Sequence, residues 1–210
     1  DWPVMMLSSL ALYGVIAFDG EIQRYEGVVL FVLLIVFLVY LLRFQKTAVI
    51  DEMSEDDEEL PLYKDVLFLA IGGLALWGGS ELLIDGSVSL AKAFGISERI
   101  IGITIVSVGT SIPELAASVI AVLKKEKAIS LGNLLGSNIF NVLAVLGITS
   151  MVTPVSITDM RLLTNDIFWM LGFALLVFPL VFFPVRMKLS WKEGVILLAL
   201  YAVFIYKMVA

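Results

Sequence analysis

The sequence predicts an all-α fold, a polytopic bundle of transmembrane helices. Hydrophobic residues make up 60% of the 210-residue chain, and its mean hydropathy is +1.01. Both values are typical of a chain with several membrane spans and are too high for a soluble domain with one core. The apolar residues also gather into runs close to the roughly 20 residues that a helix needs to cross a bilayer.

Seven such runs predict seven spans. In chain order they cover about residues 3–19, 26–43, 65–90, 97–123, 129–150, 164–184 and 190–208. The first run has no basic segment before it. It is therefore interpreted as a span of the mature protein and not as a secretory signal.

Lysine and arginine predict the orientation, because loops on the cytoplasmic side carry an excess of both. One side of the predicted bundle collects nine basic residues, namely Arg43, Lys46, Lys64, Lys124, Lys125, Lys127, Arg186, Lys188 and Lys192, and the other side collects five. The loops 44–64, 124–128 and 185–189 are therefore expected in the cytoplasm. The membrane is expected to be the plasma or inner membrane of the cell.

An acidic run at residues 51–59 lies between the second and third spans and supplies much of the net charge of −6. It is interpreted as part of a solvated cytoplasmic linker, residues 44–64, between two bundles of helices. The alternative is a weak regulatory cation site. The run lacks the glycine and the alternating ligand spacing of an EF-hand loop, which favours the linker.

Two spans resemble each other and indicate an internal repeat. Residues 24–42 and 191–209 both have an aromatic residue shortly before Glu-Gly-Val, and aligning Glu26 with Glu193 gives an offset of 167 residues. Five predicted spans lie from the third to the last, and an odd number reverses the orientation of the second copy, as in the inverted repeats of secondary transporters. The alternative is that two apolar helices are similar by composition alone.

The repeat predicts how the chain is organised. Residues 1–43 would be the last two spans of a first repeat, 44–64 the linker, and 65–210 a second repeat of five spans. The counterpart of Glu114 would then fall upstream of residue 1. The chain is therefore expected to lack the first three spans of its first repeat.

The fourth span contains the first of two polar clusters, GTSIPE at residues 109–114. An ionisable residue at membrane depth is by default a candidate functional group, and no lysine or arginine lies near Glu114 in its own span or the next. Pro113 removes a backbone N–H, and Gly109 permits a break or a close approach. An opened helix would expose carbonyl oxygens beside Thr110 and Glu114, and hard oxygen donors suit Na⁺ or Ca²⁺.

The second cluster is GNLLGSNIFN at residues 132–141 in the fifth span. The spacing of Gly132 and Gly136 predicts that a neighbouring helix approaches closely there. Ser137 and Asn141 are four residues apart and are expected to bind an ion. Asn133 and Asn138 are each equally consistent with a ligand and with a residue that ties helices together.

Glu81 and Asp85 lie one turn apart near the end of the third span. They are interpreted as residues at the membrane interface, where an aspartate is tolerated. The alternative is that they line an entry path for ions.

The paired clusters resemble the second α-repeat of the calcium/cation antiporter superfamily, the sodium/calcium exchangers. The likeness extends from about Gly78 to Gly147 and places the α-repeat at 97–150. The resemblance implies an inverted-repeat exchanger fold of ten spans, of which about seven are present, with a midplane site built from both α-repeats. By this resemblance, Thr110, Ser111 and Glu114 supply a hydroxyl, backbone carbonyls and the bridging carboxylate to the ion. Ser137 and Asn141 complete the half of the ion site that this α-repeat forms. Many relatives have aspartate in place of Asn141, which puts the stoichiometry and the Ca²⁺ preference in question.

The expected function is exchange of Ca²⁺ for Na⁺ by alternating access, with Glu114 binding either ion but not both at once. The alternatives are coupling to H⁺ or K⁺ within the same family and a cation channel with the same polar clusters. No enzyme activity, cofactor or nucleic acid is expected, and the absence of histidine and cysteine argues against Ser-His and thiolate chemistry. The expected partners are the two ions, the lipid bilayer and the missing N-terminal repeat.

Overall fold

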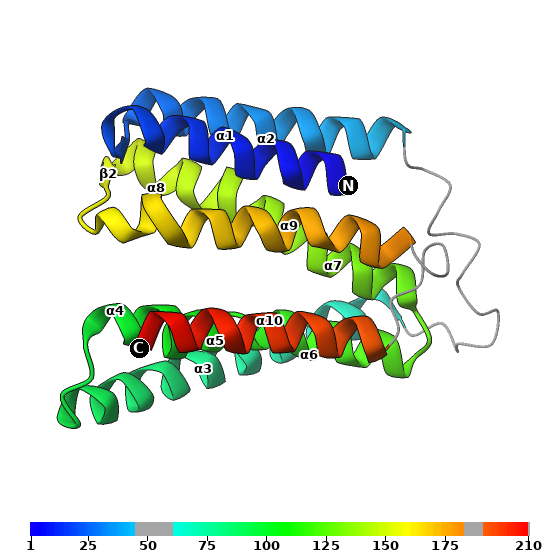
Figure 1. The fold of residues 1–210 in the computed structure, drawn as a ribbon. Coiled ribbons are helices and arrows are strands. Elements are labelled where there is room, and N and C mark those ends of the chain that lie inside the picture. The colour runs from blue at the N-terminus through cyan, green and yellow to red at the C-terminus, as the bar shows by residue number, and fades with distance from the viewer. Residues whose placement is uncertain (45–60, 183–190, 210) are drawn as a thin grey trace. The chain divides into compact units, whose positions relative to one another are not determined.

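A computed structural model describes residues 1–44, 61–182 and 191–209, and a helix occupies each predicted window (Figure 1). The elements in chain order are α1 (Trp2–Asp19), β1 (Glu21–Ile22), α2 (Arg24–Phe44), α3 (Leu62–Ala93), α4 (Glu98–Ile101), η2 (Gly102–Val106), α5 (Ser107–Thr110), α6 (Ile112–Leu123), α7 (Lys127–Phe140), η3 (Asn141–Leu146), α8 (Gly147–Val152), β2 (Val155–Ser156), η4 (Leu162–Asp166), α9 (Ile167–Phe182) and α10 (Trp191–Val209). The three η segments are π-helical turns within longer helical stretches. The acidic run 51–59 and the predicted loop 185–189 lie outside the described residues.

Five of the described helices are long and apolar enough to cross a membrane, and a sixth span results when the bent pair Arg99–Thr110 and Ile112–Leu123 counts as one. Within the described residues, α10 is a 19-residue helix that is not among them. It carries three charged residues, Lys192, Glu193 and Lys207, and a window of 18 residues with more than two charges does not count as a span. The polytopic helical fold is confirmed, but one predicted span fewer meets these criteria.

Local signals explain where the first helix begins and ends. Pro3 occupies the first turn of α1, where its missing N–H is not needed. Gly20 ends the helix with φ 75°, and its N–H donates to the Ile16 carbonyl at 3.1 Å. The chain then forms β1, which pairs antiparallel with β2. This short ribbon joins the end of α1 to the turn after α8.

The described residues divide into two compact units by contact. Unit 1 comprises the described parts of 1–48 and 134–204, and unit 2 those of 49–133 and 205–210. These units reflect packing and not sequence similarity. The division into residues 1–43, 44–64 and 65–210 therefore stays a prediction.

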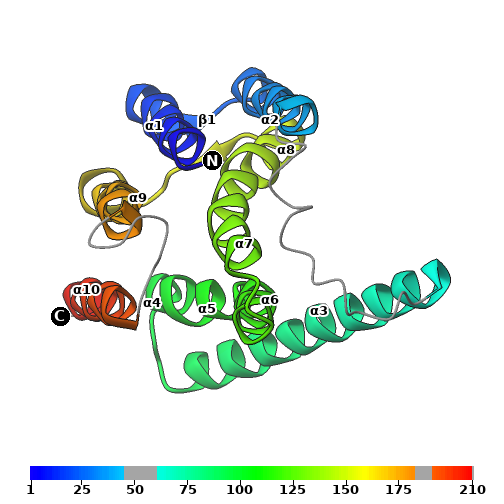
Figure 2. The same ribbon diagram turned by 90° about the vertical axis from the view of Figure 1, so that its right-hand side faces the viewer.

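In unit 1, α2 packs against α8 through two glycines (Figure 2). A Cβ on Gly27 would lie 2.6 Å from the Gly147 carbonyl oxygen and 2.9 Å from the Met151 nitrogen, and it would also meet Ser150 Oγ. Ser150 is fully buried there, and its hydroxyl donates to the Leu146 carbonyl at 2.7 Å. Close approach of backbones at small residues is how helices associate in lipid, so this contact fixes the α2–α8 crossing.

In unit 2, α3 packs along α5 and α6 (Figure 2). The contact centres on Gly109, because a Cβ there would lie 3.0 Å from Ile84 Cδ1 and would also meet Ile84 Cγ1. The close approach predicted at Gly109 is confirmed. This packing supports the helix that carries the first polar cluster.

Candidate functional site

The fourth span is broken at Ser111. α5 ends at Thr110, α6 begins at Ile112, and the helical stretches on either side are bent by 41°. Ser111 itself has φ −91° and ψ 1°, outside the helical region. Pro113 follows in the first turn of α6, where proline is favoured. The predicted break in this helix is confirmed, and the coordination of an ion by its oxygens stays a prediction.

The break leaves one backbone carbonyl without its usual helical partner. A helix carbonyl normally accepts from the N–H four residues later, and Pro113 has none, so the Gly109 carbonyl lacks that bond. The Thr110 hydroxyl donates within its own helix, at 2.9 Å to the Val106 carbonyl and 3.2 Å to the Ser107 carbonyl. Because a hydroxyl has one donor and two lone pairs, Thr110 Oγ1 can still accept or coordinate. Thr110 and Ser111 are both exposed in unit 2.

Glu114 lies in the first turn of α6, directly after the break. Its Oε2 is buried, and it is the one buried side-chain nitrogen or oxygen without a hydrogen-bond partner among the residues that the structure describes. A buried polar atom without a partner is costly, and a carboxylate more so. The N-terminus of a helix partly offsets the negative charge. A bound cation would supply the missing partner.

Among the described residues, Glu114 does not belong to a group of three or more acidic side chains that could hold a metal ion. The described part of the chain contains no group of three or more His, Cys, Asp or Glu side chains that could hold a metal ion. Glu81 and Asp85 are exposed on α3, and whether they line an entry path stays open. The local donor set is therefore one carboxylate with hydroxyl and carbonyl oxygens, which fits Na⁺ and Ca²⁺ better than a soft metal.

Substitution of Gly109 with alanine is expected to destabilise unit 2. The new methyl group would displace Ile84 from the α3–α5 contact, and overpacking of this kind typically lowers the free energy of unfolding by about 1–3 kcal/mol. Thermal unfolding of the complete protein in detergent measures the loss. Gly102→Ala is the matched control, because the described chain has no atom within 4 Å of the Cβ position of Gly102. Equal melting temperatures for the two variants would contradict the prediction.

Ser137 and Asn141 belong to unit 1, and the structure describes them there. Ser137 lies on α7, and its hydroxyl donates to the Leu134 carbonyl at 3.3 Å. Asn141 is exposed and is the first residue of η3. The structure thus brings Thr110, Ser111 and Glu114 together at one helix break. Their combination with Ser137 and Asn141 stays a prediction.

The close approach predicted at Gly132 and Gly136 is not found. Apart from the adjacent backbone of its own helix, no atom of the described chain lies within 4 Å of the Cβ position of either glycine. The small-residue contact in unit 1 is formed by Gly27 and Gly147 instead.

The sequence interpretation also missed Ser118. The Asn133 side-chain nitrogen Nδ2 donates to the Glu114 carbonyl and to Ser118 Oγ, at 2.9 Å in each case. The signal was present, because Ser118 lies four residues after Glu114 and is a hydroxyl in an apolar helix. The helix-tying interpretation of Asn133 is therefore confirmed.

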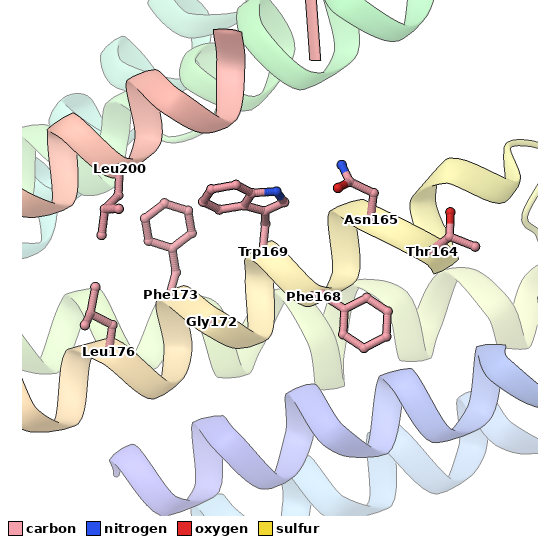
Figure 3. Close-up of a pocket in the computed structure, with 8 residues that line it drawn as sticks. All are labelled: Thr164, Asn165, Phe168, Trp169, Gly172, Phe173, Leu176 and Leu200. Carbon is pink, nitrogen blue, oxygen red and sulfur yellow. The ribbon is translucent and has the colours of Figure 1, made fainter. Parts of the chain in front are cut away.

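Unit 1 also contains a pocket of about 380 Å³. It is lined by Thr164, Asn165, Phe168, Trp169, Gly172, Phe173, Leu176 and Leu200 (Figure 3). Figure 3 shows the Trp169 and Phe173 rings on the side of α9 that Leu200 of α10 approaches. The lining contains no carboxylate, and apolar groups predominate. This pocket therefore lacks the chemistry of a cation site.

Fold and site together define a polytopic helical membrane protein with an oxygen-lined break in one span. The model of the sodium/calcium exchanger protein family matches residues 64–210, more than half of the chain. The chain belongs to this family, and it is an integral membrane protein.

Individual relatives agree with this assignment. The putative antiporter CaxA of Alkalimonas amylolytica is 37% identical over 206 residues, which cover 94% of this chain and 64% of CaxA. The sodium/calcium exchanger MaX1 of Methanosarcina acetivorans is 39% identical over 116 residues, 55% of this chain and 33% of MaX1. A solved structure of the sodium-calcium exchanger NCX_Mj, soaked with Na⁺ and Sr²⁺, matches 98% of this chain and 65% of its own with a TM-score of 0.70 and 26% identity. The chain thus spans less than two thirds of the length of these relatives.

Proposed function

We propose that the complete protein is a secondary antiporter that exchanges Ca²⁺ for Na⁺ across a cell membrane by alternating access. One observation carries the proposal, namely the buried and unpartnered Oε2 of Glu114 beside the helix break. Membership in the sodium/calcium exchanger family makes a transported cation the natural partner for this oxygen. The proposed ligands are Thr110, Ser111, Glu114, Ser137 and Asn141.

The mechanism follows from competition for one charged site. A single Ca²⁺ or the Na⁺ ions that replace it would neutralise Glu114, while the hydroxyl and carbonyl oxygens complete the shell. Because the same carboxylate cannot serve both ions at once, each half of the transport cycle carries one kind of ion in one direction, and the other half returns the other ion. Discontinuous helices with exposed backbone oxygens at the site are a recurring feature of secondary transporters.

A second carboxylate is expected from outside this chain. We propose that a first repeat in the complete protein supplies a counterpart of Glu114 and closes the other half of the site. Two pseudo-symmetric acids would balance the charge of one Ca²⁺ far better than one. This chain alone should accordingly not transport.

The direct test is uptake of radiolabelled Ca²⁺ into vesicles that contain the complete protein and are loaded with Na⁺. Outward gradients of Na⁺, K⁺ and H⁺ are compared at equal ionic strength. Uptake driven by Na⁺ alone supports the proposal. Uptake driven by a K⁺ or H⁺ gradient would show that this ion, and not Na⁺, is the counter-ion. Ca²⁺ flux that needs no gradient of another ion would indicate a channel.

Asn141→Asp is expected to raise the apparent affinity for Ca²⁺. An additional carboxylate near the bound cation would lower the half-saturating Ca²⁺ concentration by about tenfold, since each 1.4 kcal/mol of added attraction is a factor of ten. The rate of Ca²⁺ uptake against Ca²⁺ concentration measures this. Asn138→Asp is the matched control, because Asn138 is exposed and donates to the Leu134 carbonyl of its own helix at 2.7 Å. The same shift in both variants would show a general charge effect and remove Asn141 from the ligand set.

A further inference from the structure

Asn133 joins the two helices that carry the polar clusters. Its Nδ2 lies 2.9 Å from the Glu114 carbonyl oxygen and 2.9 Å from Ser118 Oγ. All three residues are in unit 2 and are half-buried. The two acceptors lie one helical turn apart, so one amide of α7 bridges the first turn of α6, which carries the Glu114 carboxylate, and the turn that follows it.

The orientation of this amide follows from its partners. A backbone carbonyl can only accept, so the NH₂ group of Asn133 must face Glu114. The two hydrogens of this NH₂ group then form the two hydrogen bonds to α6, one to the Glu114 carbonyl and one to Ser118 Oγ. An aspartate at this position could not make either bond, and an apolar residue would leave Ser118 Oγ without this donor.

The position of the contact matters because α6 begins immediately before it. Ser111 has lost helical geometry, and the first turn of α6 has no continuous helix before it to fix its rotation. In that setting, hydrogen bonds from a neighbouring helix determine where the Glu114 side chain lies.

We propose that Asn133 is a positioning residue for cation binding, which holds Glu114 through its backbone carbonyl. Asn133 itself does not coordinate the ion. The inference rests on the proposed function, because it assumes that Glu114 binds the transported cation. It assigns Ser118 the role of the second anchor for the same amide.

The test measures the half-saturating Ca²⁺ concentration separately from the maximal rate, with the complete protein in vesicles. Asn133→Ala is expected to raise the half-saturating concentration by about three- to tenfold, the range that loss of interhelical hydrogen bonds in a membrane implies. Asn133→Leu retains most of the side-chain volume and is expected to give the same increase. Ser118→Ala keeps the bond to Glu114 and is expected to give a smaller increase.

Asn138→Ala is the matched control, since Asn138 lies on the same helix, is exposed and donates to the Leu134 carbonyl of that helix. Its half-saturating concentration should equal that of the unmodified protein. An unchanged value in Asn133→Leu, or a lower maximal rate without a change in half-saturation, would overturn the proposal. If Asn133→Ala does not reach the membrane, Asn133→Leu and Ser118→Ala decide in the same way.

Failure of this inference differs from failure of the proposed function. If Glu114→Gln abolishes uptake and the Asn133 variants bind Ca²⁺ normally, only the role of Asn133 is wrong. If Glu114→Gln transports normally, the proposed site is wrong, and the Asn133 variants no longer bear on ion binding.

Discussion

Glu114→Gln is expected to abolish Na⁺-driven Ca²⁺ uptake by the complete protein. Glutamine has nearly the same size and keeps one oxygen in place, so the substitution removes the charge and little else. Removing one partner of a buried ion pair typically costs about 3–5 kcal/mol of free energy, because the other charge is left buried and unpaired. A loss of that size corresponds to at least about a hundredfold in apparent affinity, because each 1.4 kcal/mol is a factor of ten. Initial rates of Ca²⁺ uptake over a range of Ca²⁺ concentrations measure the effect.

Glu126→Gln is the matched control for this substitution. Glu126 lies in the turn after α6, outside the helix break, and the change removes the same charge from the same part of the chain. Its uptake should equal that of the unmodified protein. Glu114→Asp, which withdraws the carboxylate by one methylene, should retain partial activity with weaker Ca²⁺ binding. Normal uptake by Glu114→Gln, or equal loss in Glu126→Gln, would contradict the assignment.

Among substitutions that add one methyl group at a glycine of unit 1, Gly27→Ala is expected to lower the free energy of unfolding most. The added Cβ would lie 2.6 Å from the Gly147 carbonyl oxygen and 2.9 Å from the Met151 nitrogen. Both atoms are backbone, so α2 and α8 must separate, and the free energy of unfolding should fall by about 3 kcal/mol, the upper end of the usual range for overpacking. Thermal unfolding of the complete protein in detergent measures the change.

Gly14→Ala is the control for helix propensity and for the added methyl group. Gly14 lies within α1 of the same unit, and the described chain has no atom within 4 Å of its Cβ position. Its melting temperature should stay the same or rise slightly, because alanine is the better helix former. If Gly27→Ala and Gly14→Ala have the same melting temperature, the close α2–α8 contact does not contribute to stability as predicted.

The sequence predicted the helices and the break because both depend on local chemistry. Apolar runs of the length of a span specify membrane helices without reference to neighbours. Pro113 and Gly109 interrupt a helix through their own backbones, so the break at Ser111 could be read from the residues themselves. The close approach at Gly109 followed from the same reasoning.

The contacts between helices could not be predicted in the same way. The spacing of Gly132 and Gly136 indicates a small surface, but it does not say which helix fills that surface, and the close contact formed between Gly27 and Gly147 instead. Ser118 was overlooked because its role depends on Asn133, a residue 15 positions away. The apolar runs did not predict the π-helical turns η2, η3 and η4. Long-range partners of this kind become visible only when the chain is folded.

The most direct test of the account is equilibrium binding of radiolabelled Ca²⁺ to the purified complete protein while the Na⁺ concentration is raised. The account predicts that Na⁺ displaces Ca²⁺ fully, and that Glu114→Gln binds neither ion at the concentrations that saturate the unmodified protein. Ca²⁺ that stays bound at saturating Na⁺, or a Glu114→Gln variant that binds Ca²⁺ with unchanged affinity, would contradict the claim that one carboxylate serves both ions in turn.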